Sequence, residues 1–172
     1  NDKLITDLTV PSDIVEIKKY TFYNYSNLTD ITLHDGVTSI GEYAFAYCGN
    51  ISKLRLSENL VSIGNNAFYE CSGTLVLANT MIEADYTSES SWHSIFNSNF
   101  THISIDKSVV RIGNNALSGF SSLVEIEIPE SVTSIGDYAL ANCNSLTNLK
   151  IPNSVISIGE GAFNSCDGLL EV

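Results

Sequence analysis

Apolar and polar residues alternate in short segments that return at a fixed interval along the chain. Over residues 146–151, Leu149 and Ile151 alternate with Asn148 and Lys150, which is the two-residue period of a strand with one buried face. Pro152 then ends the segment, because a proline cannot donate a hydrogen bond to a neighbouring strand. We predict strands with this pattern over residues 5–10, 28–33, 51–56, 100–105, 123–128 and 146–151.

A second apolar pattern follows each predicted strand. Val155 and Ile158 predict a second short extended segment, and Gly159 predicts a turn where a β-carbon would be unfavourable. Residues 162, 163 and 166 are apolar again, at the spacing of one side of a helix. We therefore expect a short helical turn on the side of each repeat opposite the strand.

The isoleucine of the second segment recurs with a period of about 23 residues, within the range typical of repeat proteins. Its copies are Ile17, Ile40, Ile63, Ile112, Ile135 and Ile158. The one long interval, from Ile63 to Ile112, is three residues more than two periods and therefore contains a degenerate copy. A fixed period of this length indicates a solenoid, in which each repeat buries its apolar side only against its neighbours.

The repeat predicts a single solenoid domain over residues 1–172. Regular repeats are expected over about 14–77 and 100–172, and a longer, degenerate repeat over about 74–100. Because the sequence stops partway through a repeat, at Val172, we expect it to be a piece of a longer chain.

These segments resemble the BspA-like branch of the leucine-rich repeats. The shared string is L-x-x-L-x-(I/L)-P-x-S-V-x-S-I-G-x-x-A-(F/L)-x-x-C, which residues 146–166 match closely and residues 123–143 nearly as well. The resemblance covers essentially the whole chain and is weakest over residues 74–100. It implies an α/β, right-handed leucine-rich-repeat solenoid with one parallel strand per repeat. It also implies a place on bacterial or protist surface proteins and adhesion to host or matrix proteins, but it identifies no ligand contacts.

Four cysteines occupy one position of the repeat, eight residues after the isoleucine. They are Cys48, Cys71, Cys143 and Cys166. Tyr25 and Phe120 hold this position in other copies, so it is an apolar packing position where a free thiol behaves as a small hydrophobic group. Disulfides between neighbouring copies are the alternative, which the stacking of a solenoid allows.

Charge excludes two classes of partner. Asp and Glu number 20 against 8 Lys and Arg, for a net charge of −12. Nucleic acids and anionic membrane surfaces are bound through basic patches, so neither is expected. No segment approaches the roughly 18 apolar residues of a membrane-spanning helix. No cofactor or metal is expected either, because no catalytic or ligand-spacing motif occurs.

Outward-facing residues of the predicted strands form two columns across the solenoid. The columns read Asp30, Lys53, His102, Glu125 and Asn148, and Thr32, Arg55, Ser104, Glu127 and Lys150. Sheets of solenoids are common binding surfaces, so these residues are candidate contacts for a protein ligand. The alternative is a solvated sheet face that binds nothing.

The degenerate repeat holds the only tryptophan, Trp92. Tryptophan is enriched where interfaces concentrate their binding energy, so an exposed Trp92 would be a further candidate contact. The alternative is that the aromatic residues of this segment fill the space between the two regular halves.

Three functions are compatible with these features. The expected one is a non-catalytic protein-interaction or adhesion module outside the cell. A structural spacer that displays another domain shares the same sequence features. An enzyme is the third, because Glu125 and Glu127 would lie about 7 Å apart on one strand face, in the range of glycosidase carboxylates; their neighbours, however, supply no aromatic-lined cleft.

Overall fold

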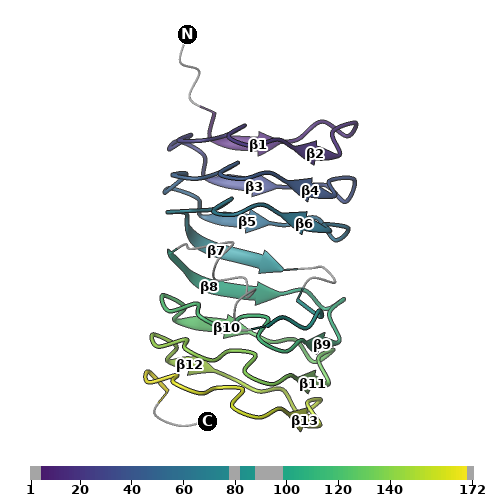
Figure 1. Cartoon of the computed structure of the whole chain (residues 1–172), viewed down its shortest axis with the longest axis vertical. Coiled ribbons are helices and arrows are strands. Elements are labelled where there is room, and N and C mark those ends of the chain that lie inside the picture. The colour runs from purple at the N-terminus through teal and green to yellow at the C-terminus, as the bar shows by residue number, and fades with distance from the viewer. Residues whose placement is uncertain (1–4, 78–81, 88–98, 170–172) are drawn as a thin grey trace.

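The structure is a computed structural model that describes residues 5–77, 82–87 and 99–169. Short strands and turns repeat along one axis and stack into an elongated column (Figure 1). β1 (Asp7–Thr9) lies at one end of the column, and β13 (Ser157–Ile158) lies at the other. The architecture is a parallel β-solenoid with one sequence repeat in each regular turn.

One parallel sheet runs the length of the column. Its strands, in spatial order, are β1 (Asp7–Thr9), β3 (Asp30–Thr32), β5 (Lys53–Arg55), β7 (Ser72–Leu77), β8 (Asn99–Ile105), β10 (Glu125–Glu127) and β12 (Asn148–Leu149). The six predicted strands are confirmed, and β7 is a seventh that the sequence pattern did not predict. Regular neighbours pair in register one full repeat apart, as Ile31 does with Leu54.

The second extended segments form two smaller parallel sheets. One contains β2 (Glu16–Ile17), β4 (Ser39–Ile40) and β6 (Ser62–Ile63), and the other contains β9 (Arg111–Ile112), β11 (Ser134–Ile135) and β13. The repeat isoleucines pair directly within each sheet, as Ile17 does with Ile40 and Ile135 with Ile158. The predicted second segment is therefore confirmed.

The predicted helical turns, and with them the α/β class, are wrong, because no helix forms in the described residues. In the turn over residues 41–48, Tyr43 and Tyr47 have φ of 53° and 62°, which a right-handed helix cannot accommodate. N–H groups alternate between a carbonyl three residues back and one in the next turn. Ala44 donates to Gly41 at 3.3 Å and Phe45 donates to Ala67 at 2.8 Å. The apolar spacing identified the buried side correctly but could not reveal these left-handed residues.

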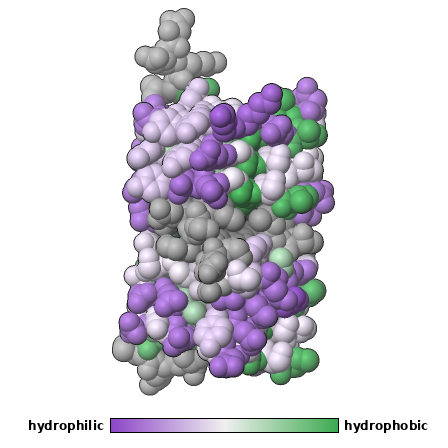
Figure 2. Space-filling model, in the orientation of Figure 1, coloured by the Kyte–Doolittle hydropathy of each residue, from purple (hydrophilic) through white to green (hydrophobic). Residues whose placement is uncertain are grey.

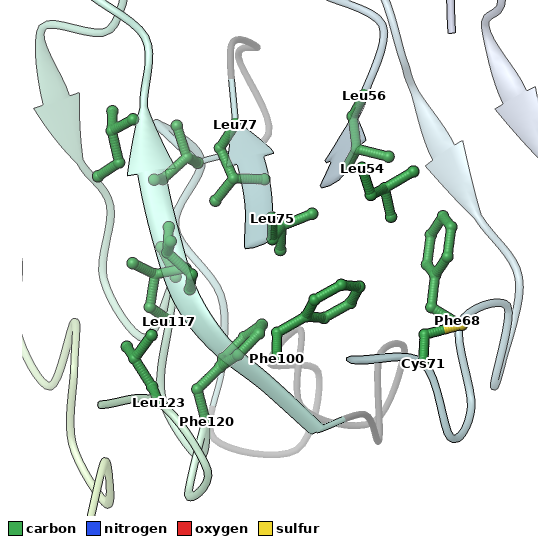
Figure 3. Packing of buried hydrophobic residues seen from close by; sticks show 14 of the residues in the cluster. Leu54, Leu56, Phe68, Cys71, Leu75, Leu77, Phe100, Leu117, Phe120 and Leu123 are labelled. Carbon is green, nitrogen blue, oxygen red and sulfur yellow. The ribbon is translucent and has the colours of Figure 1, made fainter. Parts of the chain in front are cut away.

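The interior is a set of apolar columns between the long sheet and the turns. Figure 3 shows Leu54 of β5 and Leu75 of β7 pointing into the same space as Phe68 and Cys71 of a turn. All four of these side chains are fully buried. The four cysteines are free and buried, so the prediction of a packing position is confirmed and the disulfide alternative is not.

The repeat glycine is required by the approach of the preceding turn. A β-carbon on Gly64 would lie 2.4 Å from the backbone nitrogen of Glu42, and one on Gly41 would lie 2.4 Å from that of Lys19. Their φ angles are not positive, so conformational freedom is not the reason. Lys18 holds the same position in the first turn, which has no earlier turn against it in the described residues.

The degenerate copy has fewer residues than a regular repeat between β5 and β7, and more residues than a regular repeat between β7 and β8. Leu54 pairs with Leu75, which follows it by less than one regular repeat, whereas Leu75 pairs with Ile103, which follows by more than one. Ile82 takes the place of the repeat isoleucine: it is fully buried, and its carbonyl accepts a hydrogen bond from Gly113 at 2.8 Å. The hidden copy predicted between Ile63 and Ile112 is confirmed.

Candidate functional site

The outward-facing side chains of the long sheet form a continuous polar surface, which we call the outer ribbon. One column reads Asp7, Asp30, Lys53, Thr74, His102, Glu125 and Asn148, and the other reads Thr9, Thr32, Arg55, Val76, Ser104 and Glu127. The structure thus brings the predicted strand residues into one sheet and on one face. Lys150 follows β12 directly and is exposed.

Sequence reasoning missed four members of the outer ribbon, Asp7 and Thr9 of β1 and Thr74 and Val76 of β7. The two residues of β7 pair with Lys53 and Arg55 on one side and with His102 and Ser104 on the other. The two predicted halves of the ribbon are therefore separated by one additional strand. The alternation of Thr74, Leu75, Val76 and Leu77 was the available signal, but the shortened turn before it shifts this strand out of the regular register.

Around β5, the outer ribbon is basic and bordered by carboxylates. The Arg55 guanidinium donates to Glu58 at 2.9 Å and lies 3.8 Å from Asp35. Asp30, one strand before, accepts a hydrogen bond from the hydroxyl of Ser52 at 3.1 Å. The Lys53 side chain is exposed, so β5 presents one ammonium group to solvent, whereas Arg55 is paired with the bordering carboxylates.

Around β8 and β10, the outer ribbon is acidic and linked by hydrogen bonds. The hydroxyl of Ser104 donates to Glu127 at 2.9 Å, and Nε2 of His102 lies 3.7 Å from a carboxylate oxygen of Glu125. Nδ1 of the same histidine is 2.9 Å from the hydroxyl of Thr101. These contacts hold the side chains in a defined arrangement on the surface.

Two shallow hollows lie over this acidic part. One, of about 110 Å³, is lined by Thr74, His102, Ile103, Ser104, Glu125 and Glu127. The other, of about 340 Å³, is lined by residues 125–128 and 148–150. Neither lining contains Phe, Tyr or Trp among the residues the structure describes. The hollows offer carboxylates, hydroxyls, an imidazole, an amide and an ammonium to a partner's side chains.

The structure describes only part of the degenerate copy, and Trp92 lies outside the described residues. In the described part, Asp85 accepts hydrogen bonds from Arg111 at 2.6 Å and from the N–H of Asn114 at 2.8 Å. The Asn114 N–H and then the Arg111 guanidinium lower the pKa of Asp85. Glu83 likewise accepts from the N–H of Val110 at 2.7 Å. These carboxylates fasten the degenerate copy to the turn that follows it.

A separate column of exposed β-branched residues runs beside the small sheets. It comprises Val15, Thr38, Val61, Val110, Thr133 and Ile156. Figure 2 shows hydrophobic side chains gathered mainly along the side of the molecule where these sheets run. The hydroxyls of Thr38 and Thr133 each donate to the carbonyl one turn earlier, at 3.2 Å. The two threonines are therefore engaged within the solenoid.

No metal centre or membrane-spanning element is found in the described part of the chain. No three His, Cys, Asp or Glu side chains there gather closely enough to hold a metal ion. None of the described segments is a helix with the length and apolarity that crossing a bilayer requires.

Several solved structures resemble this fold. A leucine-rich repeat protein of T. pallidum is 24% identical in sequence, with a TM-score of 0.57, over 98% of this chain and 79% of that one. A leucine-rich cell surface protein of Faecalibacterium prausnitzii is 24% identical, with a TM-score of 0.48, over 96% of this chain and 46% of that one. The pneumococcal vaccine antigen PcpA is 19% identical, with a TM-score of 0.42, over 95% and 60%. The likeness to the first of these supports the fold.

The repeat itself identifies the family. No curated protein sequence matches the chain. The family model described as the BspA type leucine-rich repeat region matches residues 1–84 and 91–172, in six copies. The matched ranges include every regular turn seen in the structure and the strand β7 that begins the degenerate copy. The chain therefore belongs to the BspA-type leucine-rich repeat family.

Proposed function

We propose that this chain is a non-catalytic protein-interaction module of a cell-surface protein, and that the outer ribbon binds its protein ligand. The observation that carries the proposal is the outer ribbon itself, in which cationic, hydroxyl and anionic side chains share one face of one sheet. Repeats of this family are typically non-catalytic. The resemblance to surface leucine-rich repeats supports adhesion outside the cell.

The outer ribbon presents the exposed ammonium of Lys53 on β5 and the carboxylates of Glu125 and Glu127 on β10, which favours a ligand that carries charges of both signs. Lys53 and Arg55 lie on β5, whereas Glu125 and Glu127 lie on β10, three strands further along. With about 4.8 Å between strands, β5 and β10 are roughly 14 Å apart. Such complementarity sets orientation and partner choice more than it sets affinity.

Binding to immobilised, purified extracellular-matrix proteins would test this proposal. We compare the wild type with two double variants, Lys53→Gln with Arg55→Gln, and Glu125→Gln with Glu127→Gln. We expect each pair to weaken binding to the same matrix protein at least about fivefold and to lower its dependence on salt. The matched control, Lys107→Gln with Glu130→Gln, changes exposed charges away from the sheet and should bind as the wild type does.

Two results would contradict the proposal. If both ribbon variants bind a matrix protein as tightly as the wild type, the ligand does not use the outer ribbon. If the folded wild type binds no member of the panel at millimolar concentration, the spacer function is favoured. Circular dichroism of each variant confirms that the fold is retained.

A further inference from the structure

Five tyrosine rings on the first three turns touch one another in an unbroken chain. Tyr43 stacks on Tyr20 with ring centroids 5.5 Å apart and planes 7° apart, and Tyr20 meets Tyr23 edge to face at 5.7 Å. Tyr23, Tyr47 and Tyr69 continue the chain edge to face at 5.4 and 5.3 Å. We call these five residues the tyrosine cluster.

The tyrosine cluster lies outside the core and remains accessible. Tyr20, Tyr23 and Tyr47 are 50%, 43% and 42% exposed. The interior of the same turns is filled by a separate column, in which Phe45 stacks on Phe22 and on Phe68 at 5.1 and 5.4 Å. Because these phenylalanines already supply the core, the exposed tyrosines are available for contacts with another molecule.

The turns hold the tyrosine cluster in place before any ligand arrives. The N–H of Tyr20 donates to Glu42 at 3.1 Å, and the N–H of Tyr47 donates to Tyr69 at 2.8 Å. Asn66 donates through its side-chain amide to the hydroxyl of Tyr43 at 3.1 Å. Side chains that are ordered in advance lose little conformational freedom on binding.

The surroundings of the tyrosine cluster are electrically neutral in a strongly acidic protein. The three turns, residues 18–25, 41–48 and 64–71, carry Lys18, Lys19, Glu42 and Glu70, two charges of each sign. The chain as a whole has a net charge of −12. The exposed amides of Asn24 and Asn65, on the same turns, add uncharged donors and acceptors. This chemistry selects neither a cationic nor an anionic ligand.

We propose that the tyrosine cluster binds a neutral polysaccharide chain. The negatively polarised face of an aromatic ring attracts the C–H groups on the flat face of a pyranose ring, and the phenol and amide groups can exchange hydrogen bonds with sugar hydroxyls. Rings repeated over three successive turns suit a polymer of repeated rings better than a single sugar. This surface lies on the turns, so it is separate from the outer ribbon.

Titration calorimetry of the wild type with defined oligosaccharides tests the proposal. The probes are β-1,4-linked oligomers of glucose and of N-acetylglucosamine, with two and with six units. We expect at least one hexamer to bind more tightly than its dimer. We expect the double substitution Tyr23→Ala with Tyr47→Ala to weaken that binding at least about tenfold. Losses of this size are typical when central aromatic residues of a binding interface are removed.

Tyr138 provides the matched control. It occupies the position of Tyr20 and Tyr43 in a later turn, is 38% exposed, and has no ring contact among the described residues. Tyr138→Ala should leave saccharide binding unchanged, and the Lys53→Gln and Arg55→Gln ribbon variant should do the same.

A second readout needs no substitution. The bound hexamer should protect Tyr23 and Tyr47 of the wild type from nitration and leave Tyr138 reactive. Failure of every hexamer to bind, an equal loss in the Tyr138→Ala variant, or binding of a proline-rich peptide alone would each overturn the proposal. The last result would indicate that the cluster recognises a polyproline helix instead.

Discussion

The Sγ atom of Cys71 donates a hydrogen bond to the backbone carbonyl of Phe45, in the preceding turn, at 3.1 Å. The other three cysteines repeat this contact with the preceding turn at 3.1 to 3.4 Å, in the pairs Cys48 with Phe22, Cys143 with Leu117, and Cys166 with Leu140. The cysteine column therefore does more than fill space, because each thiol links its own turn to the one before it.

Removal of one such thiol should weaken the stack. We expect Cys71→Ala to lower the free energy of unfolding by about 1–2 kcal/mol, through a small cavity and a lost hydrogen bond. Urea denaturation followed by circular dichroism measures this. Ser121→Ala also removes one heavy atom, at an exposed position, and should cost less than about 0.5 kcal/mol. Equal effects of the two substitutions would show that the thiol is not part of the core.

The buried thiols should make the protein less stable in alkali. Burial raises the pKa of Cys48 to about 11 and shifts the pKa of Cys71 in the same direction. A raised pKa means that the folded state favours the neutral thiol. This stability is complete below about pH 9 and is lost as the pH rises toward and beyond 11. Urea midpoints at pH 8, 9.5 and 11 should fall for the wild type.

A double variant isolates the contribution of the thiols. Partial desolvation and then the neighbouring Tyr69 also raise the pKa of Tyr47, so this tyrosine contributes to the alkaline loss in every variant. Cys48→Ala with Cys71→Ala should show a smaller fall between pH 9.5 and 11 than the wild type does. Parallel pH profiles for the two proteins would mean that the thiols ionise as freely in the folded state as in the unfolded state.

The repeat glycine should tolerate no side chain. We expect Gly64→Ala to destabilise the protein by about 1–3 kcal/mol, as overpacking does, because the added carbon meets the rigid backbone of the preceding turn. Thermal unfolding measures the loss. The control is Gly49→Ala, whose added carbon would meet only the carbonyl oxygen of Glu70, at an ordinary 3.6 Å. The close packing of turns would be refuted if both variants melted alike.

At the turn residues with positive φ, stability should depend strongly on which residue is substituted. Asn142 has a φ of 61° and an exposed side chain. Asn142→Gly should be neutral or slightly stabilising, whereas Asn142→Val should cost about 1–2 kcal/mol, because a β-branched residue resists this conformation. Asn164→Val, at an exposed position with ordinary φ, is the matched control. A similar unfolding midpoint for the two valine variants would indicate that residue 142 is helical after all.

Much of the architecture follows from positions that recur in every repeat. The spacing of Ile40 and Ile63, and of Leu54 beside Lys53 and Arg55, was enough to predict stacked strands with one apolar and one polar face. It also predicted the buried cysteines, because Cys71 and Phe120 share one position of the repeat, although Tyr25 at that position in the first turn is exposed. Periodicity carries this information because each turn contacts copies of itself.

The remainder depends on properties that periodicity does not encode. Asn, Tyr and Glu at positive φ are compatible with a helix as far as the sequence shows, so the apolar spacing predicts helical turns that do not form. Gly73, with a φ of 109°, lies within β7 at the register shift that precedes Thr74, so the periodicity does not place Thr74 and Val76. Tyr23 and Tyr47 are in contact but occupy different positions of the repeat. Comparing equivalent positions of the aligned repeats therefore does not reveal this contact.

Residue-resolved amide hydrogen exchange by NMR tests the stacked fold most directly. The N–H of each repeat glycine donates to an isoleucine carbonyl of the preceding turn at 2.7 or 2.8 Å, in Gly41, Gly64, Gly113, Gly136 and Gly159. The N–H of Gly36 instead donates to the nearby ring of His34. We predict that the amides of the five repeat glycines exchange at least about a hundredfold more slowly than the amide of Gly36. Because the turns open cooperatively, the five glycines should lose protection together. Exchange of the five glycines as fast as that of Gly36 would contradict the stack of hydrogen-bonded turns.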